Sequence, residues 1–512
     1  MSKKAKNSQS EVLRRISDNW LQITLLLLFL LAFAVRMIDL TDAPLDFHPT
    51  RQFRGALIAR SLYFELSPSE DSEYQDQMLA LRNSVAKLEP PIVESIVAFT
   101  YFLGGSEQLW MARIVNSLFW MLGGWALFGL AKRVSSTPAA LIALAYYFFL
   151  PFSVSASRSF QPDPFMVSWM AIAAYAAFRW SEERNWKWAI ITGATAGFAI
   201  LIKAVAAYFL GAMLIAVVLY QIGFKRALRE AQVWGIFALS LLPASIYYLF
   251  GLADRSTDYF QKWIVALLPL AFEPGFYVRW LSFIGSTFGL SIILLALISV
   301  LFAKGVFRWI LIGLWVGYLL YGITLPHQTL THNYYHLPFL MILALSLAPV
   351  LQLLVDEISK REKIWQAAFA LIVMGAIAFN ALLSRNALVA EDHRNEAAYW
   401  ESIGQALPQN GRVVGLVQHY GNLLNYYGYR NIALWPVLGE LKLAELRGND
   451  TSDFDEIFLN RTDGADYFLV TTFNQLEQQG PLSERLYTQY PIWDEGDGYI
   501  IFDLRESASE TQ

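Results

Sequence analysis

Apolar runs repeat along the chain from about residue 20 to residue 384, with short polar connections between them. A helix needs roughly 20 apolar residues to cross a bilayer core of about 30 Å. The run from Trp186 to Tyr220 predicts two helices that meet near Lys203, because one helix of about 50 Å is too long to cross once. The pattern predicts about eleven spans, at 20–38, 110–131, 137–153, 164–181, 186–202, 203–223, 231–251, 282–303, 307–324, 334–355 and 363–384.

The connection 39–109 is too long to be a simple turn. Residues 56–63 and 92–103 each predict a short amphipathic helix, of the kind that lies in the plane of the membrane interface. The acidic segment 65–76 between them is expected to be solvated. The chain therefore divides into a basic N-terminus (1–19), a membrane domain (20–384) with this large external loop, and a remainder (385–512).

The remainder has the pattern of a soluble α/β domain. Helices are expected near 394–406, 421–428 and 437–446, between apolar segments that predict buried strands at 412–417, 431–435, 465–470 and 499–502. Alternation of this kind predicts a small, mainly parallel sheet. The domain has no glycine-rich phosphate fingerprint, so it is assigned no cofactor.

The composition agrees with a polytopic α-helical membrane protein. Of the 512 residues, 55% are hydrophobic and 16% are charged, with a mean hydropathy of +0.37, whereas soluble domains carry about a quarter charged residues. The net charge of −4 gives no indication of nucleic-acid binding. Cysteine is absent, which excludes disulfides, thiolate metal sites and thiol nucleophiles.

The placement of lysine and arginine predicts the orientation in the cell (inner) membrane. Basic residues gather in the N-terminus and in alternate connections, near 132–133, 179–187, 225–229, 304–308 and 360–363. By the positive-inside rule these connections are cytoplasmic. An odd number of spans then makes the C-terminal domain extracytoplasmic. The first run is expected to be an uncleaved anchor, and Ala32-Phe33-Ala34 leaves a cleavable signal peptide as the alternative.

The first cluster of polar residues follows the first predicted span and contains Asp46, His48, Arg51 and Arg54. Asp46 is a candidate general base or, with His48, a candidate metal ligand. The two arginines are candidates to hold a phosphate. The alternative is a polar loop with a proline turn, whose arginines reach the membrane interface.

A second cluster, with Arg158 and Asp163, lies in the turn before the fourth predicted span, where Pro162 and Pro164 bracket Asp163. Asp163 is a candidate active-centre carboxylate, and the alternative is a helix N-cap with Pro164 at the first helical position.

Lys203 interrupts an apolar run, and a lysine at the centre of a span costs about 2.5–3.5 kcal/mol on insertion scales. It is therefore expected at an external helix end that faces an anion, with simple snorkelling as the alternative.

The third cluster holds three of the six histidines, His327, His332 and His336, together with Tyr335. His332 and His336 are four residues apart, so a helix would place them on one face as a metal pair. No HExxH pattern or third nearby ligand accompanies them, which favours hydrogen bonds to a phosphate or sugar, with Tyr335 as a further donor. No metal site is assigned, and a divalent metal at Asp46, His48, His332 and His336 stays an alternative.

Four short motifs along residues 20–384 carry a family resemblance. They are the segment that ends in Ile58-Ala59-Arg60, Lys87-Leu88-Glu89-Pro90-Pro91, Gln161-Pro162-Asp163-Pro164, and Asn333-Tyr334-Tyr335-His336-Leu337-Pro338. In these motifs the chain resembles the GT-C glycosyltransferases, in particular the branch of protein O-mannosyltransferases and lipid A aminoarabinose transferases. The resemblance implies a GT-C-like fold and an undecaprenyl- or dolichyl-phosphate sugar as donor, used from the extracytoplasmic side.

The resemblance also implies roles for individual residues. Asp46 and Asp163 would be the catalytic carboxylates, and the donor phosphate or sugar would be bound by His48, Arg51, Arg54, Arg158, Lys203, His332, Tyr335 and His336. One departure concerns the Asp-Glu doublet of the family, since alignment from Ile58 places Arg51-Gln52 there. This departure favours Asp163 over Asp46 as the base.

The chemistry suits such a reaction. A polyprenyl phosphate leaves as a stabilised anion, so the site needs cations rather than a general acid, and a carboxylate takes the proton of the acceptor hydroxyl. The sequence predicts an inverting hexosyl- or pentosyltransferase that uses a lipid, glycan or protein acceptor. The alternatives are a polytopic lipid or glycan transporter or flippase, and a non-catalytic scaffold that binds through its C-terminal domain.

Overall fold

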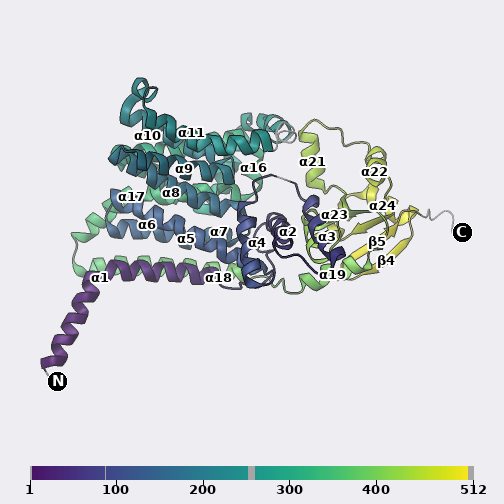
Figure 1. Cartoon of the computed structure of the whole chain (residues 1–512), viewed down its shortest axis with the longest axis horizontal. Helices are drawn as coiled ribbons and strands as arrows, with labels where there is room; N and C mark the ends of the chain where they lie inside the picture. The colour runs from purple at the N-terminus through teal and green to yellow at the C-terminus, as the bar shows by residue number, and fades with distance from the viewer. Residues whose placement is uncertain (1–2, 87, 252–259, 506–512) are drawn as a thin grey trace.

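The computed structural model describes residues 3–86, 88–251 and 260–505, with side chains from Asn19 onward. Lys87 and residues 252–259, in the connection between the predicted spans 231–251 and 282–303, lie outside the described residues. Figure 1 shows a stack of long helices on one side and a smaller domain with a sheet on the other, with α2, α3 and α4 between them.

The helical stack follows the chain order closely. Its first half contains α1 (Lys3–Arg36), α5 (Leu109–Val134), α6 (Thr137–Phe149), α7 (Pro151–Arg158), α8 (Pro162–Glu183), α9 (Trp186–Ile202), α10 (Ala206–Ala227), α11 (Ala231–Ser245) and η2 (Ile246–Gly251). Its second half contains η3 (Gln261–Val265), η4 (Leu268–Phe272), α13 (Pro274–Phe288), α14 (Leu290–Ser299), η5 (Val300–Phe302), α15 (Gly305–Thr324), α16 (Pro326–Thr331), η6 (Asn333–His336), α17 (Leu337–Ser359) and α18 (Lys363–Leu388).

The predicted number of spans is not confirmed, although each predicted span overlaps at least one helix. In the described part of the chain, seven helices are long and apolar enough to cross a membrane, or up to nine if each of two bent pairs is one span. One bent pair is α6 and α7, which meet at 61° where Pro151 begins the second helix. The prediction that two helices meet near Lys203 is confirmed, because α9 ends at Ile202 and α10 begins at Ala206.

Close packing of backbones holds the helices together. α10 and α15 approach so closely that a Cβ atom on Gly313 would lie 2.4 Å from the Cα of Met213, and one on Gly317 would lie 2.5 Å from the carbonyl oxygen of Tyr208. Small residues permit this approach in membranes, where helix association depends on van der Waals contact. In an apolar stretch of 18 residues, 6% of the residues are buried within Lys363–Leu388 and 67% within Asn333–Ser359, so α17 lies inside the stack and α18 on its outside.

The first long connection, residues 39–109, is more helical than predicted. It contains α2 (Pro49–Leu66), α3 (Ser72–Leu81), η1 (Arg82–Ser84) and α4 (Ile92–Gly104). The helix predicted at 92–103 is confirmed, and the one at 56–63 is the middle of the longer α2. The acidic segment is largely exposed, as expected. It also starts an unpredicted helix, α3, because Asp71 caps the backbone N–H groups of Glu73 and Tyr74.

The C-terminal domain contains a five-stranded sheet in the order β2-β1-β3-β5-β4. Its elements are α19 (Glu396–Ala406), β1 (Val413–Leu416), η7 (Gln418–Gly421), α20 (Asn422–Tyr427), β2 (Ala433–Leu434), α21 (Leu438–Leu446), α22 (Phe454–Thr462), β3 (Tyr467–Val470), α23 (Phe473–Gln478), α24 (Gly480–Gln489), β4 (Ile492–Gly496) and β5 (Tyr499–Asp503). The prediction of a mainly parallel sheet is wrong. β1 pairs in parallel with β2 and β3, but β5 pairs antiparallel with β3 and β4. The reason is the β4–β5 hairpin, which turns at Asp497-Gly498, a dipeptide favoured in two-residue hairpin turns.

The C-terminal domain packs against α2. The Arg60 guanidinium lies 3.6 Å from the ring centroid of Tyr426 and donates to both carboxylate oxygens of Glu107, at 3.1 and 2.8 Å. Phe53 meets the Tyr426 ring edge-on at 5.4 Å, and Asn422 donates to the carbonyl oxygen of Thr50 at 3.1 Å. These contacts fix the orientation of α2, whose first turns carry predicted site residues.

Candidate active site

A buried ion pair joins two of the predicted clusters. Lys203 Nζ lies 2.8 Å from Oδ1 and 3.0 Å from Oδ2 of Asp163, and their side chains are only 8% and 3% exposed. Lys203 is placed here because α9 ends one residue earlier and the backbone becomes extended. The N-cap alternative for Asp163 is wrong. Gln161 is the N-cap and Pro162 takes the first helical position, so the carboxylate lies in the first turn and pairs with Lys203.

Two aromatic rings from η6 cover this ion pair. Lys203 Nζ lies 5.3 Å from the ring centroid of Tyr334 and 5.1 Å from that of Tyr335. The Arg51 guanidinium also approaches Tyr334, at 5.9 Å. Aromatic faces attract cations electrostatically, so the two rings help to hold positive charge at this point. Tyr335 was predicted from its cluster, whereas Tyr334 was not.

His48 connects the first and third clusters. It precedes α2 with φ +48°, a left-handed conformation that is uncommon outside glycine and turns the chain into the helix. Its Nε2 lies 2.7 Å from Oδ1 of Asn333, and its ring lies 5.4 Å from that of His332. Burial lowers the pKa of His48, and desolvation together with the neighbouring His48 lowers the pKa of His332 to about 4. Both imidazoles are therefore neutral near pH 7 and contribute hydrogen bonds rather than charge.

Glu89 is a site carboxylate that the sequence prediction missed. It lies 2.7 Å from Arg51 and 3.5 Å from Arg54, with a side chain 11% exposed. Burial alone would raise its pKa, but Arg51, Arg54 and Lys203 outweigh burial and lower the pKa of Glu89 to about 2. Its signal was present, since Glu89 lies in the second motif of the family resemblance. Arg54 also donates to the carbonyl oxygen of Ala86, at 2.9 Å.

Asp46 and Arg158 form a different group. Asp46 lies 3.3 Å from Arg113 and 4.0 Å from Arg158, and its side chain is 17% exposed. Both arginines also bind backbone carbonyl groups of the preceding loop. Arg113 donates to Leu40 at 2.8 Å, and Arg158 donates to Asp39 at 3.0 Å. The structure thus pairs Asp46 with cations other than Lys203.

His336 lies behind the site, within the helical stack. It is fully buried, and its Nε2 lies 2.8 Å from the carbonyl oxygen of Thr329 while its Nδ1 lies 2.8 Å from the Tyr318 hydroxyl. Since a carbonyl oxygen only accepts, Nε2 carries the proton and Nδ1 accepts from Tyr318. Both ring nitrogens therefore have protein partners. The metal pair of His332 and His336 does not form, because residues 333–336 adopt a 3-10 helix that turns His336 inward.

The remaining metal alternative also finds no ligand set. Among residues 19–86, 88–251 and 260–505, no three His, Cys, Asp or Glu side chains form a group that could hold a metal ion. His327 contacts Trp263, with ring centroids 6.1 Å apart. The donors proposed for a metal, Asp46, His48, His332 and His336, are instead divided among the arrangements described above.

Buried amide side chains position the turn before α8. Gln52 accepts from the backbone N–H of Phe160 at 2.8 Å and donates to the carbonyl oxygen of Phe47 at 2.7 Å. It therefore ties the loop that carries Asp46 to the turn that carries Asp163. Gln161 differs, because neither polar atom of its buried side chain has a protein partner. An unpaired buried amide is costly unless water or a ligand completes its hydrogen bonds.

The predicted residues therefore meet only in part. Asp163, Lys203, Tyr335, Arg51, His48 and His332 form one network of contacts that runs through Tyr334, and Arg54 joins it through Glu89. The network presents ammonium, guanidinium and neutral imidazole groups beside carboxylates. Such a set can bind an anionic group and accept a proton nearby.

Comparisons with known proteins agree with the fold. Residues 88–249 match the family model described as dolichyl-phosphate-mannose-protein mannosyltransferase. The structure of ArnT from Cupriavidus metallidurans bound to undecaprenyl phosphate is similar, with a TM-score of 0.56 and 14% identity over 94% of this chain and 98% of that chain. The archaeal oligosaccharyltransferase AglB from Archaeoglobus fulgidus, in complex with an inhibitory peptide and a dolichol-phosphate, is similar over 95% of this chain and 74% of that chain, with a TM-score of 0.56 and 12% identity. A search of curated proteins gives no match. None of these similarities favours the transporter or flippase alternative.

Proposed function

This integral membrane protein has the fold of the GT-C membrane glycosyltransferases, and from that premise we propose that it transfers a sugar from a polyprenyl-phosphate donor to a lipid, glycan or protein acceptor. The reaction takes place at the extracytoplasmic membrane surface and inverts the anomeric centre. The similar ArnT structure is bound to undecaprenyl phosphate and the similar AglB structure to a dolichol-phosphate, which supports a donor of this class.

One observation carries the proposal. Asp163 and Lys203 form a bidentate ion pair that is almost fully buried beneath Tyr334 and Tyr335. Burial of an ion pair costs desolvation energy that its mutual attraction repays only with good geometry, so a pair of this kind is weak evidence of a purely stabilising role. A base and a phosphate-binding cation in contact are the two groups that the reaction requires.

The donor phosphate rearranges these charges in the proposed mechanism. The phosphate binds Lys203 and Arg51, and Lys203 is then shared between the phosphate and Asp163. The acceptor hydroxyl attacks the anomeric carbon from the face opposite the phosphate, and its proton passes to Asp163. The bond between the anomeric carbon and the phosphate oxygen breaks, and the polyprenyl phosphate leaves as an anion held by the same cations.

Two further groups have proposed roles. His48, His332 and Tyr335 donate hydrogen bonds to the phosphate or the sugar, and Asp46 is retained as the second candidate carboxylate. Asp46 lies against Arg113 and Arg158, whereas Asp163 contacts Lys203, the proposed phosphate-binding cation, and this contact favours Asp163 as the base. His336 supports the site from behind through Tyr318 and Thr329.

The placement of the chain in the membrane follows from its charge pattern. The protein lies in the inner membrane through its membrane domain, residues 20–384. Its N-terminus is cytoplasmic, and residues 385–512 form a domain on the extracytoplasmic side. The contacts of Arg60 with Glu107 and Tyr426 support this proposal, since they put the C-terminal domain on the same side as the first external connection.

The proposal is tested with purified protein and a radiolabelled polyprenyl-phosphate sugar. Wild type is compared with Asp163→Asn and Asp46→Asn, and Asp392→Asn is the matched control because its side chain is 69% exposed. Sugar release or transfer should fall at least about a hundredfold in Asp163→Asn, the scale of a lost general base. Undiminished transfer in both site variants would overturn the assignment.

A further inference from the structure

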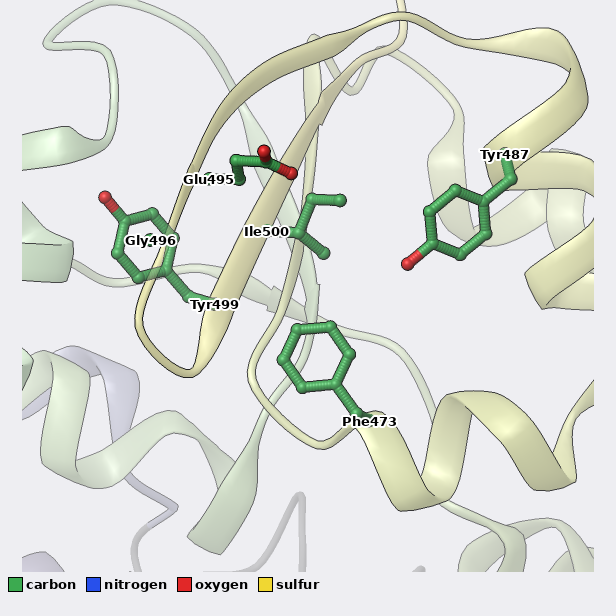
Figure 2. Close-up of a pocket in the computed structure, with 6 residues that line it drawn as sticks. All are labelled: Phe473, Tyr487, Glu495, Gly496, Tyr499 and Ile500. Carbon is green, nitrogen blue, oxygen red and sulfur yellow. The ribbon is translucent and has the colours of Figure 1, made fainter.

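A second candidate site lies in the C-terminal domain, away from the ion pair. A cavity of about 360 Å³ lies beside the β4–β5 hairpin and is lined by Phe473, Tyr487, Glu495, Gly496, Tyr499 and Ile500. Figure 2 shows these six residues. Phe473 comes from the start of α23 and Tyr487 from α24. Figure 1 places β4 and β5 at the end of the molecule opposite the helical stack.

The aromatic walls of this cavity are held in place but remain open to solvent. Tyr487 is 52% exposed and Phe473 36%, whereas Ile500, at the floor, is 4% exposed. The Tyr487 ring meets Phe502 edge-on, with centroids 5.2 Å apart. Aromatic side chains this exposed on a soluble domain, gathered in one concavity, are typical of a binding surface.

Gly496 makes room for the ring of Tyr499 on the hairpin. A Cβ atom at Gly496 would lie 2.5 Å from the ring of Tyr499, its partner on the neighbouring strand. The Tyr499 hydroxyl donates to Asp494 Oδ2 at 3.1 Å, which holds the ring across the hairpin. Neighbouring residues of a strand point to opposite faces, so this ring lies on the face of the hairpin opposite to the side chains of Glu495 and Ile500, and Figure 2 shows it on the side away from Phe473 and Tyr487.

The polar groups of the cavity select the class of ligand. Of the six lining residues, Glu495 is the only charged one and none is a cation. A carboxylate accepts hydrogen bonds and repels anions, so phosphorylated or acidic ligands are disfavoured. A neutral polyol with one apolar face fits, because the C–H face of a sugar ring packs on an aromatic ring while its hydroxyl groups donate to a carboxylate.

We propose that this cavity binds a neutral carbohydrate, the glycan part of the acceptor. The role as an acceptor site rests on the proposed function, whereas carbohydrate binding itself does not. Its volume is near the lower end of the range for small-molecule sites, about 300–1,000 Å³, and suits a sugar ring rather than a bulky group. A glycan held here and at the ion pair would gain effective concentration at the reacting site.

The binding test uses the full-length protein and three soluble probes, chitotetraose, mannotetraose and maltotetraose. Dissociation constants are measured by isothermal titration for wild type, Tyr487→Ala and Glu495→Gln. The matched control is Tyr420→Ala, because Tyr420 is an aromatic residue of the same domain that is 54% exposed and outside the cavity. At least one probe should bind wild type and the control alike, and both cavity variants should weaken it by about tenfold or more.

Two results would overturn the proposal. One is the absence of binding of every probe to wild type up to about 10 mM, and the other is equal binding by wild type and Tyr487→Ala. Asp163→Asn separates this proposal from the proposed function, since it should bind the oligosaccharide like wild type while losing transfer. Loss of transfer with intact binding leaves this inference standing, and the reverse result leaves the active site standing.

Discussion

Replacement of Lys203 by methionine tests whether the buried ion pair serves catalysis as well as stability. The substitution keeps much of the side-chain volume but removes the cation from Asp163, which is 3% exposed. Removal of one member of a buried pair costs about 3–5 kcal/mol, because it leaves an uncompensated charge. Two charge-assisted hydrogen bonds, at 2.8 and 3.0 Å, are lost at the same time. We expect the unfolding temperature to fall by several degrees.

The double variant Lys203→Met/Asp163→Asn separates the two roles. It leaves no unpaired charge, so its loss of stability should be smaller than that of Lys203→Met alone, about 2 kcal/mol or less. Sugar transfer should be lost in both single variants and in the double variant, because the site then lacks its base or its phosphate-binding cation. Stability is therefore expected to recover in the double variant, whereas activity is not.

The assay combines thermal unfolding followed by intrinsic fluorescence with transfer from labelled donor. Lys360→Met is the matched control, because Lys360 forms an exposed ion pair with Glu357 at 3.4 Å, and such pairs contribute about 0–1 kcal/mol. An unfolding temperature of Lys203→Met equal to that of Lys360→Met would refute the stability reasoning. Transfer by the double variant at the wild-type rate would refute the catalytic reasoning.

Three other substitutions give distinct outcomes. Glu89→Gln should destabilise the protein by about 3 kcal/mol, because the pKa of Glu89 in the folded state, near 2, lies below the ordinary 4.5. This stabilisation is complete above pH 4.5 and is lost toward pH 2, so the variant should flatten the dependence of unfolding temperature on pH in that range. An unchanged slope would contradict the prediction. Gln161→Leu removes an amide without protein partners and should leave the unfolding temperature unchanged or higher while raising KM for the donor; unaltered kinetics would show that no substrate uses this amide. His336→Phe removes the bonds to Tyr318 and Thr329 and should cost about 1–3 kcal/mol; the folded fraction should keep its specific activity, and a large loss per folded molecule would instead support direct contact with the donor.

Local features of the sequence predicted most of the helices and four of the five strands. Lys203 was placed at a helix end because a charge inside an apolar run is too costly to leave at mid-membrane, and α9 does end at Ile202. Strand β4 was missed, because Trp493, Asp494 and Glu495 are exposed or partly exposed and lack a buried apolar pattern. The bend between α6 and α7 was missed because Pro151 was counted within a continuous span.

Sequence reasoning identified the residues able to do the chemistry, whereas only the packed chain determined their partners. Asp163, Lys203 and Tyr335 could be selected because charged and polar groups next to or within the membrane are energetically costly unless they are paired or functional. That Lys203 pairs with Asp163, that Glu89 holds Arg51, and that His336 turns into the helical stack follow from helix packing. A buried charge pairs with the nearest opposite charge in space, and that neighbour lies tens of residues away, at a distance that no local spacing encodes.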